Sequence, residues 1–231
     1  MSDTANGQGA AQTPLEILGI MASQQVSLTP QLRHVEMYTM RGLLSLLWHE
    51  PDGVAKPFGV VMVGGAMGGM LGPGEGLYHA LGSALATNGI PSIRLSYRKP
   101  NDMDSCCVDT AAAVQLLVGS GADKVVLLGH SFGGAVAIRV GVGLAEMVNG
   151  VVTFATQSAG CEVAAGMQGR PLLMFHGDSD SILPLESSEV VRAMAGTGDL
   201  HIMHGDDHML AKSHDVMYES VMNWLNDVFA L

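Results

Sequence analysis

Three residue types that together perform nucleophilic catalysis occur in this sequence in suitable local contexts. Ser131 is the centre of the pentapeptide G-H-S-F-G (129–133), which lies between an apolar run and a run of small residues with helical spacing. Glycines on both sides of a serine allow the strained turn that exposes its hydroxyl, although an ordinary glycine-rich turn has the same letters. A serine also needs a base, and that base needs an acid that orients it.

Two later apolar runs are followed by the residue types that would complete this chemistry. The run "PLLMFHG" is followed by Asp178 and Asp180, and the run "LHIMHG" by His208. Either aspartate could orient the histidine, and the order serine, acid, histidine leaves room for a strand–helix unit between successive members. The pattern indicates acyl transfer, in which Ser131 attacks a carbonyl carbon and His208 takes its proton.

The segment "HGDDH" (204–208) also contains residue types that bind metal ions. It lacks the H-E-x-x-H spacing of zinc enzymes, and no further set of ligands is evident elsewhere in the sequence. We therefore expect neither a metal nor another cofactor in this protein.

A glycine-rich stretch, "VVMVGGAMGGMLGPG" (60–74), has two interpretations. Bare backbone after a buried strand can cradle a phosphate, or it can aim N–H groups at a reacting oxygen. The nearest match to G-x-G-x-x-G has Ala66 at its middle position, and the stretch has no lysine for a P-loop. The second interpretation is favoured.

The elements that must position these residues alternate between strands and helices. The pattern predicts a three-layer α/β/α sandwich with a mostly parallel, eight-stranded sheet that opens with an antiparallel pair. Two of the strands are connected across residues 156–170, and this stretch of 15 residues is too short for a large cap domain. Strands are expected at 34–40, 42–50, 58–65, 91–98, 123–131, 149–156, 170–177 and 199–205, and helices at 75–89, 105–121, 132–147, 184–196 and 213–229.

The chain is predicted to hold one domain, residues 34–231, after a flexible N-terminal segment, residues 1–33. Within that segment "PLEILGIMASQQ" predicts a short helix that packs on the domain or on a second subunit, so a homodimer is one expectation. The polar N-terminus has neither the basic flank nor the apolar core of a signal peptide. Ser213 is expected to cap the last helix.

Composition narrows the classes of partner. The chain has 231 residues, of which 48% are hydrophobic and 14% charged, and its net charge is −11. Negative charge without a basic cluster disfavours binding to nucleic acid or to an anionic membrane. Three cysteines, two of them adjacent, make a poor disulfide framework, and this favours a reducing compartment, the cytoplasm.

From residue 34 to its end, the chain resembles the α/β-hydrolase superfamily, and in particular its small dienelactone-hydrolase-like and serine-esterase-like members. "GHSFGG" is similar to the nucleophile elbow, "HGDSDSILP" to the acid loop H-G-x-x-D-x-x-V-P, and "GDDHML" to the terminal G-x-x-H loop. The resemblance implies that Ser131 is the nucleophile, His208 the base and Asp180 the acid. Dienelactone hydrolases proper use cysteine as the nucleophile, so the serine here favours general ester chemistry.

The resemblance also assigns the glycine-rich turn to an oxyanion hole, in which N–H groups stabilise the charged intermediate. The expected donors are Ala66 or Met67 together with Phe132. Many members of the superfamily begin this turn with His-Gly, whereas this chain has Gly64-Gly65. The position of the loop backbone is therefore an open question at the level of sequence.

The function expected from sequence is hydrolysis of small-molecule carboxylic esters by a serine hydrolase. Residues beside the motifs that could contact the substrate are Met67, Met70, Leu183 and Met209. Methionine is common throughout this chain, however, and most methionines fill a core. A thioesterase or an acyl-peptide hydrolase would use the same three catalytic residues, and a non-catalytic binding module of the same fold would use none of them.

Overall fold

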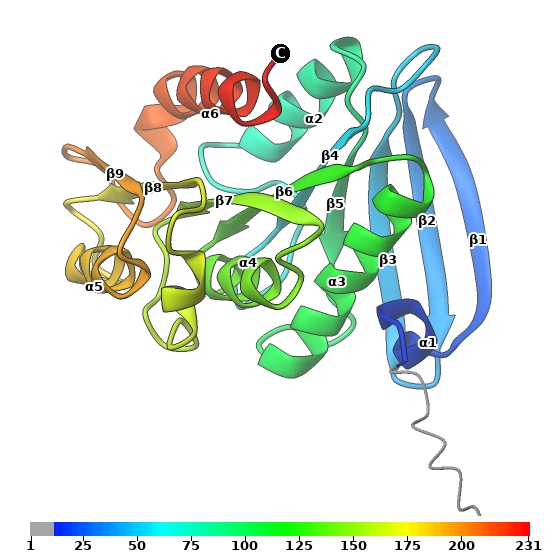
Figure 1. The fold of residues 1–231 in the computed structure, drawn as a ribbon, viewed down its shortest axis with the longest axis horizontal. Coiled ribbons are helices and arrows are strands. Elements are labelled where there is room, and N and C mark those ends of the chain that lie inside the picture. The colour runs from blue at the N-terminus through cyan, green and yellow to red at the C-terminus, as the bar shows by residue number, and fades with distance from the viewer. Residues whose placement is uncertain (1–11) are drawn as a thin grey trace, which may run out of the picture.

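Residues 12–231, which the computed structural model describes, form a nine-stranded sheet with helices on both faces (Figure 1). The strands lie in the order β1-β2-β3-β5-β4-β6-β7-β8-β9. β1, β2, β3 and β5 pair antiparallel in succession, and β5, β4 and β6 to β9 run parallel. The bounds are Ile20–Thr29 (β1), Leu32–Thr39 (β2), Gly42–His49 (β3), Phe58–Val63 (β4), Ser92–Ser96 (β5), Lys124–His130 (β6), Val148–Phe154 (β7), Leu172–Gly177 (β8) and Asp199–Met203 (β9).

The helices complete the three-layer α/β/α sandwich that the sequence predicts. Figure 1 shows α2 and α6 on one face of the sheet and α3, α4 and α5 on the other. Between β7 and β8 there is only a short 3-10 turn, Ala164–Met167, so this connection carries no cap domain, as predicted. No helix of residues 12–231 is both long and apolar enough to cross a membrane. The helices are Pro14–Leu18 (α1), Leu77–Thr87 (α2), Met103–Gly119 (α3), Phe132–Gly143 (α4), Glu186–Ala195 (α5) and His214–Phe229 (α6).

The prediction of eight strands is wrong by one, because β1 lies inside the segment expected to be flexible. Residues 20–29 pair with β2 along their length, while all ten side chains stay exposed. Because neither face of this strand is buried, "IMASQQVSLT" has no alternation of apolar and polar residues from which a strand could be predicted. The short helix expected over residues 14–25 is confirmed only at residues 14–18, because Gly19 ends it with a φ of 59° and residues 20–25 belong to β1. Residues 1–11 of the segment lie outside the described residues.

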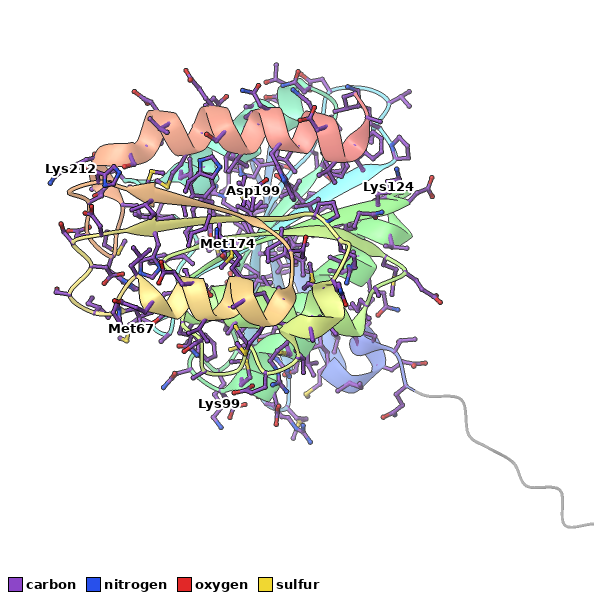
Figure 2. The ribbon with its side chains drawn as sticks, turned by 60° about the vertical axis from the view of Figure 1, so that its left-hand side comes forward. Met67, Lys99, Lys124, Met174, Asp199 and Lys212 are labelled. Atoms are coloured by element: carbon purple, nitrogen blue, oxygen red, sulfur yellow. The ribbon has the colours of Figure 1, made fainter. Side chains whose placement is uncertain are left out.

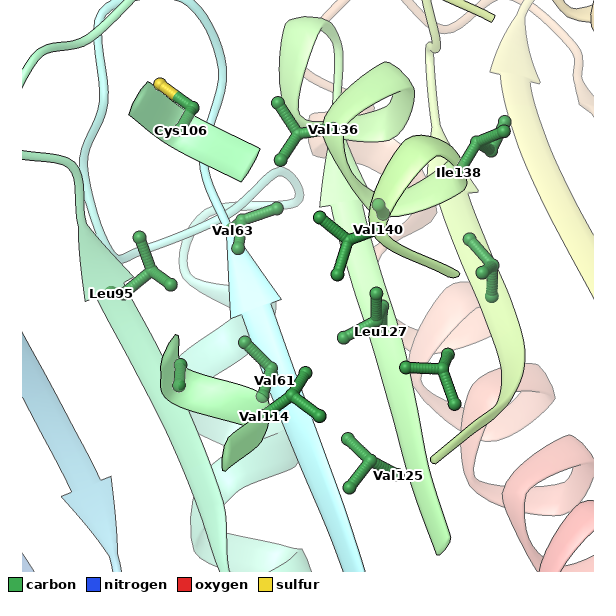
Figure 3. Packing of buried hydrophobic residues seen from close by; sticks show 14 of the residues in the cluster. Val61, Val63, Leu95, Cys106, Val114, Val125, Leu127, Val136, Ile138 and Val140 are labelled. Atoms are coloured by element: carbon green, nitrogen blue, oxygen red, sulfur yellow. The ribbon is translucent and has the colours of Figure 1, made fainter. Parts of the chain in front are cut away.

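Two apolar layers, one on each face of the sheet, hold the helices in place. Successive side chains of a strand point to opposite faces. Thus Val61 and Val63 of β4 pack in the layer that contains Val114 of α3 and Val136 of α4 (Figure 3). The alternate residues of β4, Val60 and Met62, pack in the other layer. Burial on both faces explains why these parallel strands read as continuous apolar runs.

The parallel strands bring distant segments together, because their carboxyl ends lie along the same edge of the sheet. The loops that leave this edge include those after β4 (64–76), β6 (131), β8 (178–185) and β9 (204–213). Figure 2 shows Met67 and Lys212, from two of these loops, at the end of the molecule opposite Lys124, where β6 begins. Ligands of open α/β sheets bind at this edge.

Candidate active site

Ser131 is the single residue that connects β6 to α4, and its backbone is strained. Its φ of 57° and ψ of −118° are unusual for a residue with a side chain. The flanking glycines are required, because a Cβ on Gly129 would collide with the Gly133 carbonyl and one on Gly133 with the Gly64 carbonyl. The turn also places Ser131 at the N-terminus of α4, where the helix dipole favours negative charge.

His208 and Asp180 meet between the loops that follow β9 and β8. His208 Nδ1 lies 2.7 Å from Asp180 Oδ2. The side chain of Asp180 is fully buried, and its Oδ1 accepts hydrogen bonds from the N–H groups of Ile182 at 2.8 Å and Leu183 at 2.9 Å. The carboxylate is thus held by its own loop and faces the imidazole.

The charge state of Asp180 determines which nitrogen of the His208 imidazole carries the proton. Burial raises the pKa of Asp180, but hydrogen bonds from Leu183, His208 and Ile182 outweigh it, so the pKa lies below its ordinary value. An ionised carboxylate only accepts hydrogen bonds, so Nδ1 of His208 carries the proton and donates it. Nε2 is then left with a lone pair, which is the state that a general base requires.

Asp178, the alternative acid, has different partners. Its Oδ2 lies 2.8 Å from Nδ1 of His204, and its Oδ1 accepts the N–H of Gly205 at 2.7 Å. His204 directly follows β9 and has an exposed side chain. Asp178 therefore fastens the β8 and β9 loops together at the surface, while Asp180 is the aspartate that contacts His208.

His130, the residue before Ser131, supports the loop that carries His208. Its Nε2 lies 2.9 Å from the His208 carbonyl oxygen, and the two rings are 5.0 Å apart at an interplanar angle of 45°. Burial lowers the pKa of His130 to about 4, so the ring is neutral at pH 7 and Nε2–H donates to that carbonyl. His130 therefore has a structural role beside Ser131, through packing and a hydrogen bond.

Asp206 shapes the loop between β9 and α6. It is buried, and its Oδ2 accepts the hydroxyl of Ser213 at 2.6 Å while Oδ1 accepts the N–H of Asp207 at 3.0 Å. Ser213 does occupy the N-cap position of α6, but its side chain does not cap the helix, because the hydroxyl is used for Asp206. The prediction of a side-chain cap is therefore wrong.

The possible metal ligands of "HGDDH" do not converge. His204, Asp206 and His208 each bond to a different partner outside the segment. Across residues 12–231, no three side chains of His, Cys, Asp or Glu are grouped closely enough to hold a metal ion.

The glycine loop, residues 64–72, folds back on itself after β4. Gly65 and Gly68 form an isolated bridge, with the Gly68 N–H 2.9 Å from the Gly65 carbonyl. A Cβ on Gly64 would lie 2.5 Å from the Gly69 carbonyl oxygen and 2.6 Å from that of Gly68. Such distances exclude any side chain at residue 64, which explains why this turn begins with glycine and not with histidine.

The expected oxyanion donors lie in two loops near Ser131. Phe132 is the first residue of α4, so its N–H has no acceptor within the helix. Within residues 12–231 the N–H of Ala66 likewise has no main-chain acceptor. Ala66 and Met67 line the same cavity as Ser131, whereas the ring of Phe132 is buried against Tyr97.

A cavity of about 460 Å³ opens beside the nucleophile. Three of the four residues expected to contact the substrate, Met67, Met70 and Met209, line it. Leu183 does not, and its neighbour Ile182 does. The main chain of Leu183 is used within the loop, where its N–H donates to Asp180 and its carbonyl oxygen lies 3.0 Å from Nε2 of His176. Sequence reasoning also missed Leu71, although it lies one residue after Met70.

Ser131 and His208 both line this cavity. Among the described residues the Ser131 hydroxyl is not hydrogen-bonded to His208. In ligand-free enzymes such bonds are often long and tighten only when substrate binds. The arrangement thus offers a nucleophile, an oriented base and free N–H groups around one apolar cavity.

Comparison with known proteins identifies the fold. No protein-family model and no curated protein matches the chain. Among solved structures, Est1E from Butyrivibrio proteoclasticus has a TM-score of 0.71 at 14% identity, with 86% of this chain and 99% of Est1E covered.

Two further structures agree with this result. A dienelactone hydrolase from Anabaena variabilis has a TM-score of 0.70 at 15% identity, with 84% of this chain and 97% of that one covered. A serine hydrolase without lid from Xanthomonas campestris has a TM-score of 0.68 at 15% identity, with 87% and 97% covered. The chain is similar to these proteins in its fold, and that fold is the one that its motifs resemble.

Proposed function

We propose that this protein, which has the α/β-hydrolase fold, is a serine hydrolase that cleaves carboxylic esters through an acyl-enzyme on Ser131. The observation that carries the proposal is the 2.7 Å hydrogen bond between His208 and the buried Asp180, at a cavity that His208 shares with Ser131. Similarity in fold to hydrolases and esterases supports the general class.

The reaction proceeds in two halves. The Ser131 oxygen bonds to the carbonyl carbon of the ester, while the hydroxyl proton passes to Nε2 of His208. The oxygen of the tetrahedral intermediate accepts hydrogen bonds from the N–H groups of Phe132 and Ala66. The carbon–oxygen bond to the alcohol then breaks, and the alcohol leaves with the proton from His208. Water repeats the sequence on the acyl-enzyme and releases the acid.

The cavity favours esters with an uncharged, apolar acyl group. Its side chains include Met67, Met70, Leu71, Ile182 and Met209, which carry no charge. Met67 and Leu71 are largely exposed at 94% and 65%, so the acyl group enters a cavity that is open to solvent. Ferulic acid has been observed bound to Est1E, one of the proteins with this fold, and an aromatic acyl group belongs in the substrate series for that reason.

Hydrolysis of p-nitrophenyl esters of graded acyl length, together with methyl ferulate and an acyl thioester, tests the proposal. We expect Ser131→Ala to lower kcat on the order of 10⁶-fold, because the nucleophile is lost. Ser120→Ala is the matched control, since Ser120 follows α3 and, within residues 12–231, its hydroxyl bonds only to the Leu117 carbonyl. Activity that survives Ser131→Ala would contradict the mechanism.

Labelling with a fluorophosphonate separates the remaining alternatives. The probe reacts with an activated serine whatever the natural acyl group, so we expect it to label the wild type and not Ser131→Ala. If the probe labels Ser131 and the protein cleaves thioesters or acyl-peptides but no esters, the protein is a thioesterase or an acyl-peptide hydrolase and not an esterase. A wild type that neither reacts with the probe nor cleaves any substrate would be a binding module.

A further inference from the structure

An arginine without an acidic partner is buried behind the glycine loop. Arg94 lies on β5 and is 3% exposed. None of the ion pairs formed within residues 12–231 includes it. A buried cation without a carboxylate is costly, so neutral groups must satisfy the guanidinium.

Three such groups surround it, from three different elements. Nε donates to Nε2 of His49 on β3 at 3.0 Å, and Nη1 donates to the carbonyl oxygen of Met70 at 3.1 Å. Nη2 lies 3.4 Å from Nδ1 of His79 on α2. Burial and the charge of Arg94 lower the pKa of His49 to about 4, so His49 is neutral at pH 7 and accepts the hydrogen bond.

The neighbouring helix makes room for this arrangement. A Cβ on Gly82 of α2 would lie 2.5 Å from Nε2 of His49. Glycine is unfavourable inside a helix because it loses more backbone entropy than alanine. Its presence here gives His49 the space to reach the guanidinium, so the pair is built into the fold at the expense of helix stability.

The carbonyl of Met70 belongs to the glycine loop, which is rich in residues without side chains. Five of its nine residues are glycines, so the loop cannot hold its own conformation by packing. Side chains from outside the loop hold two of its carbonyls: the Tyr97 hydroxyl donates to Gly64 at 3.3 Å, and Arg94 donates to Met70 at 3.1 Å. Ala66 lies between these two fixed points.

We propose that Arg94 is a positioning residue for the hydrolase site: His49 and His79 hold its guanidinium, which binds the Met70 carbonyl and so keeps the Ala66 N–H aimed at the reacting oxygen. This inference rests on the proposed function. The guanidinium suits the task because its rigid fork reaches a histidine and a carbonyl at once, which an ammonium group on a flexible stem cannot do.

Kinetics of Arg94→Lys test the proposal, because lysine keeps the charge and loses the fork. We expect kcat for p-nitrophenyl esters to fall about 100-fold, the loss typical of a small misplacement of catalytic groups, while KM changes little. Arg98→Lys is the matched control. The side chain of Arg98 is also buried, but it pairs with Asp109 at 2.5 Å, and within residues 12–231 none of its side-chain hydrogen bonds reaches the glycine loop. An Arg94→Lys enzyme that folds and keeps the wild-type kcat would overturn the proposal.

Hydrogen exchange of residues 64–72 provides a readout that does not need activity. We expect the loop amides to exchange faster in Arg94→Lys than in the wild type and in Arg98→Lys; an unchanged rate would overturn the inference. A wild type that cleaves no substrate would refute the proposed function, yet the exchange measurement would still decide whether Arg94 holds the loop.

A second variant keeps the test decisive if Arg94→Lys does not fold. His79 is exposed, so His79→Leu removes one partner of the guanidinium at little risk to folding. We expect a smaller loss of kcat in the same direction, together with faster exchange of the loop. If His79→Leu changes neither kcat nor the exchange rate of the loop, the contacts of Arg94 with its histidine partners do not position the loop.

Discussion

At the scale of single residues, the two aspartates of the β8 loop offer a matched pair. Asp180→Asn should lower kcat about 10⁴-fold, because a neutral amide no longer holds His208 in the tautomer with a free Nε2. Asp178→Asn should leave kcat close to that of the wild type, since Asp178 contacts His204 and the Gly205 N–H instead. Steady-state kinetics on one ester measure both.

The assignment would be contradicted if Asp178→Asn were the more damaging substitution. Thermal unfolding of both variants is the control, because each aspartate also accepts main-chain hydrogen bonds, Asp180 from its own loop and Asp178 from Gly205 in the β9 loop. A loss of kcat in Asp180→Asn without loss of fold would separate the orientation of His208 from support of the loop.

The candidate catalytic residues could be selected from sequence because each lies in a short motif in the loop that follows a strand: Ser131 after β6, Asp180 after β8 and His208 after β9. The lining of the cavity could not be selected in the same way. Whether Ile182 or Leu183 faces the cavity depends on how the loop wraps around Asp180, and both donate their N–H groups to it. The hydrogen-bonding partners of Arg94 come from three segments far apart in sequence, so no local sequence pattern predicts this group of contacts.

At the scale of elements, the parallel strands and their helices could be predicted, since burial on both faces leaves long apolar runs. β1 could not be, because it is the edge of the sheet and none of its ten side chains is buried. Its residues belong to the sheet nonetheless, and α1 before it packs on α3, where the N–H of Leu15 donates to Gln115 at 3.0 Å.

Substitutions in α1 test whether this N-terminal element belongs to the folding unit. Leu18 is 3% exposed in the core and Ile17 is 43% exposed. Leu18→Ala should lower the free energy of unfolding by about 2–5 kcal/mol, because it leaves a cavity, and Ile17→Ala should have little effect. Urea unfolding measures both. Equal and small effects would mean that α1 adds little to the stability of the domain, and they would favour the predicted boundary at residue 34.

At the scale of the whole molecule, the net charge of −11 and the apolar cavity agree with a small uncharged substrate. The three cysteines are free thiols, which agrees with their poor suitability as a disulfide framework. A cytoplasmic location, a homodimer and the absence of nucleic-acid binding stay predictions, because they depend on groups and surroundings outside this chain.

Buried histidines should make the stability of the whole molecule fall in mild acid. Burial lowers the pKa of both His49 and His130 from 6.5 to about 4. Between these values the unfolded chain takes up protons that the folded protein does not, so stability is present above pH 6.5 and is lost as the pH falls toward 4. Each histidine should contribute a loss of roughly 2 kcal/mol between pH 7 and pH 5.

The variant His130→Gln isolates one of these contributions. Glutamine does not titrate, and its amide can still donate to the His208 carbonyl. The free energy of unfolding is measured in urea at pH 7 and at pH 5. Its decrease from pH 7 to pH 5 should be smaller in His130→Gln than in the wild type, by roughly 2 kcal/mol, the contribution of one histidine. If the two proteins lose the same stability, His130 does not need to be neutral in the fold. Its support of the His208 loop would then tolerate a charged imidazole.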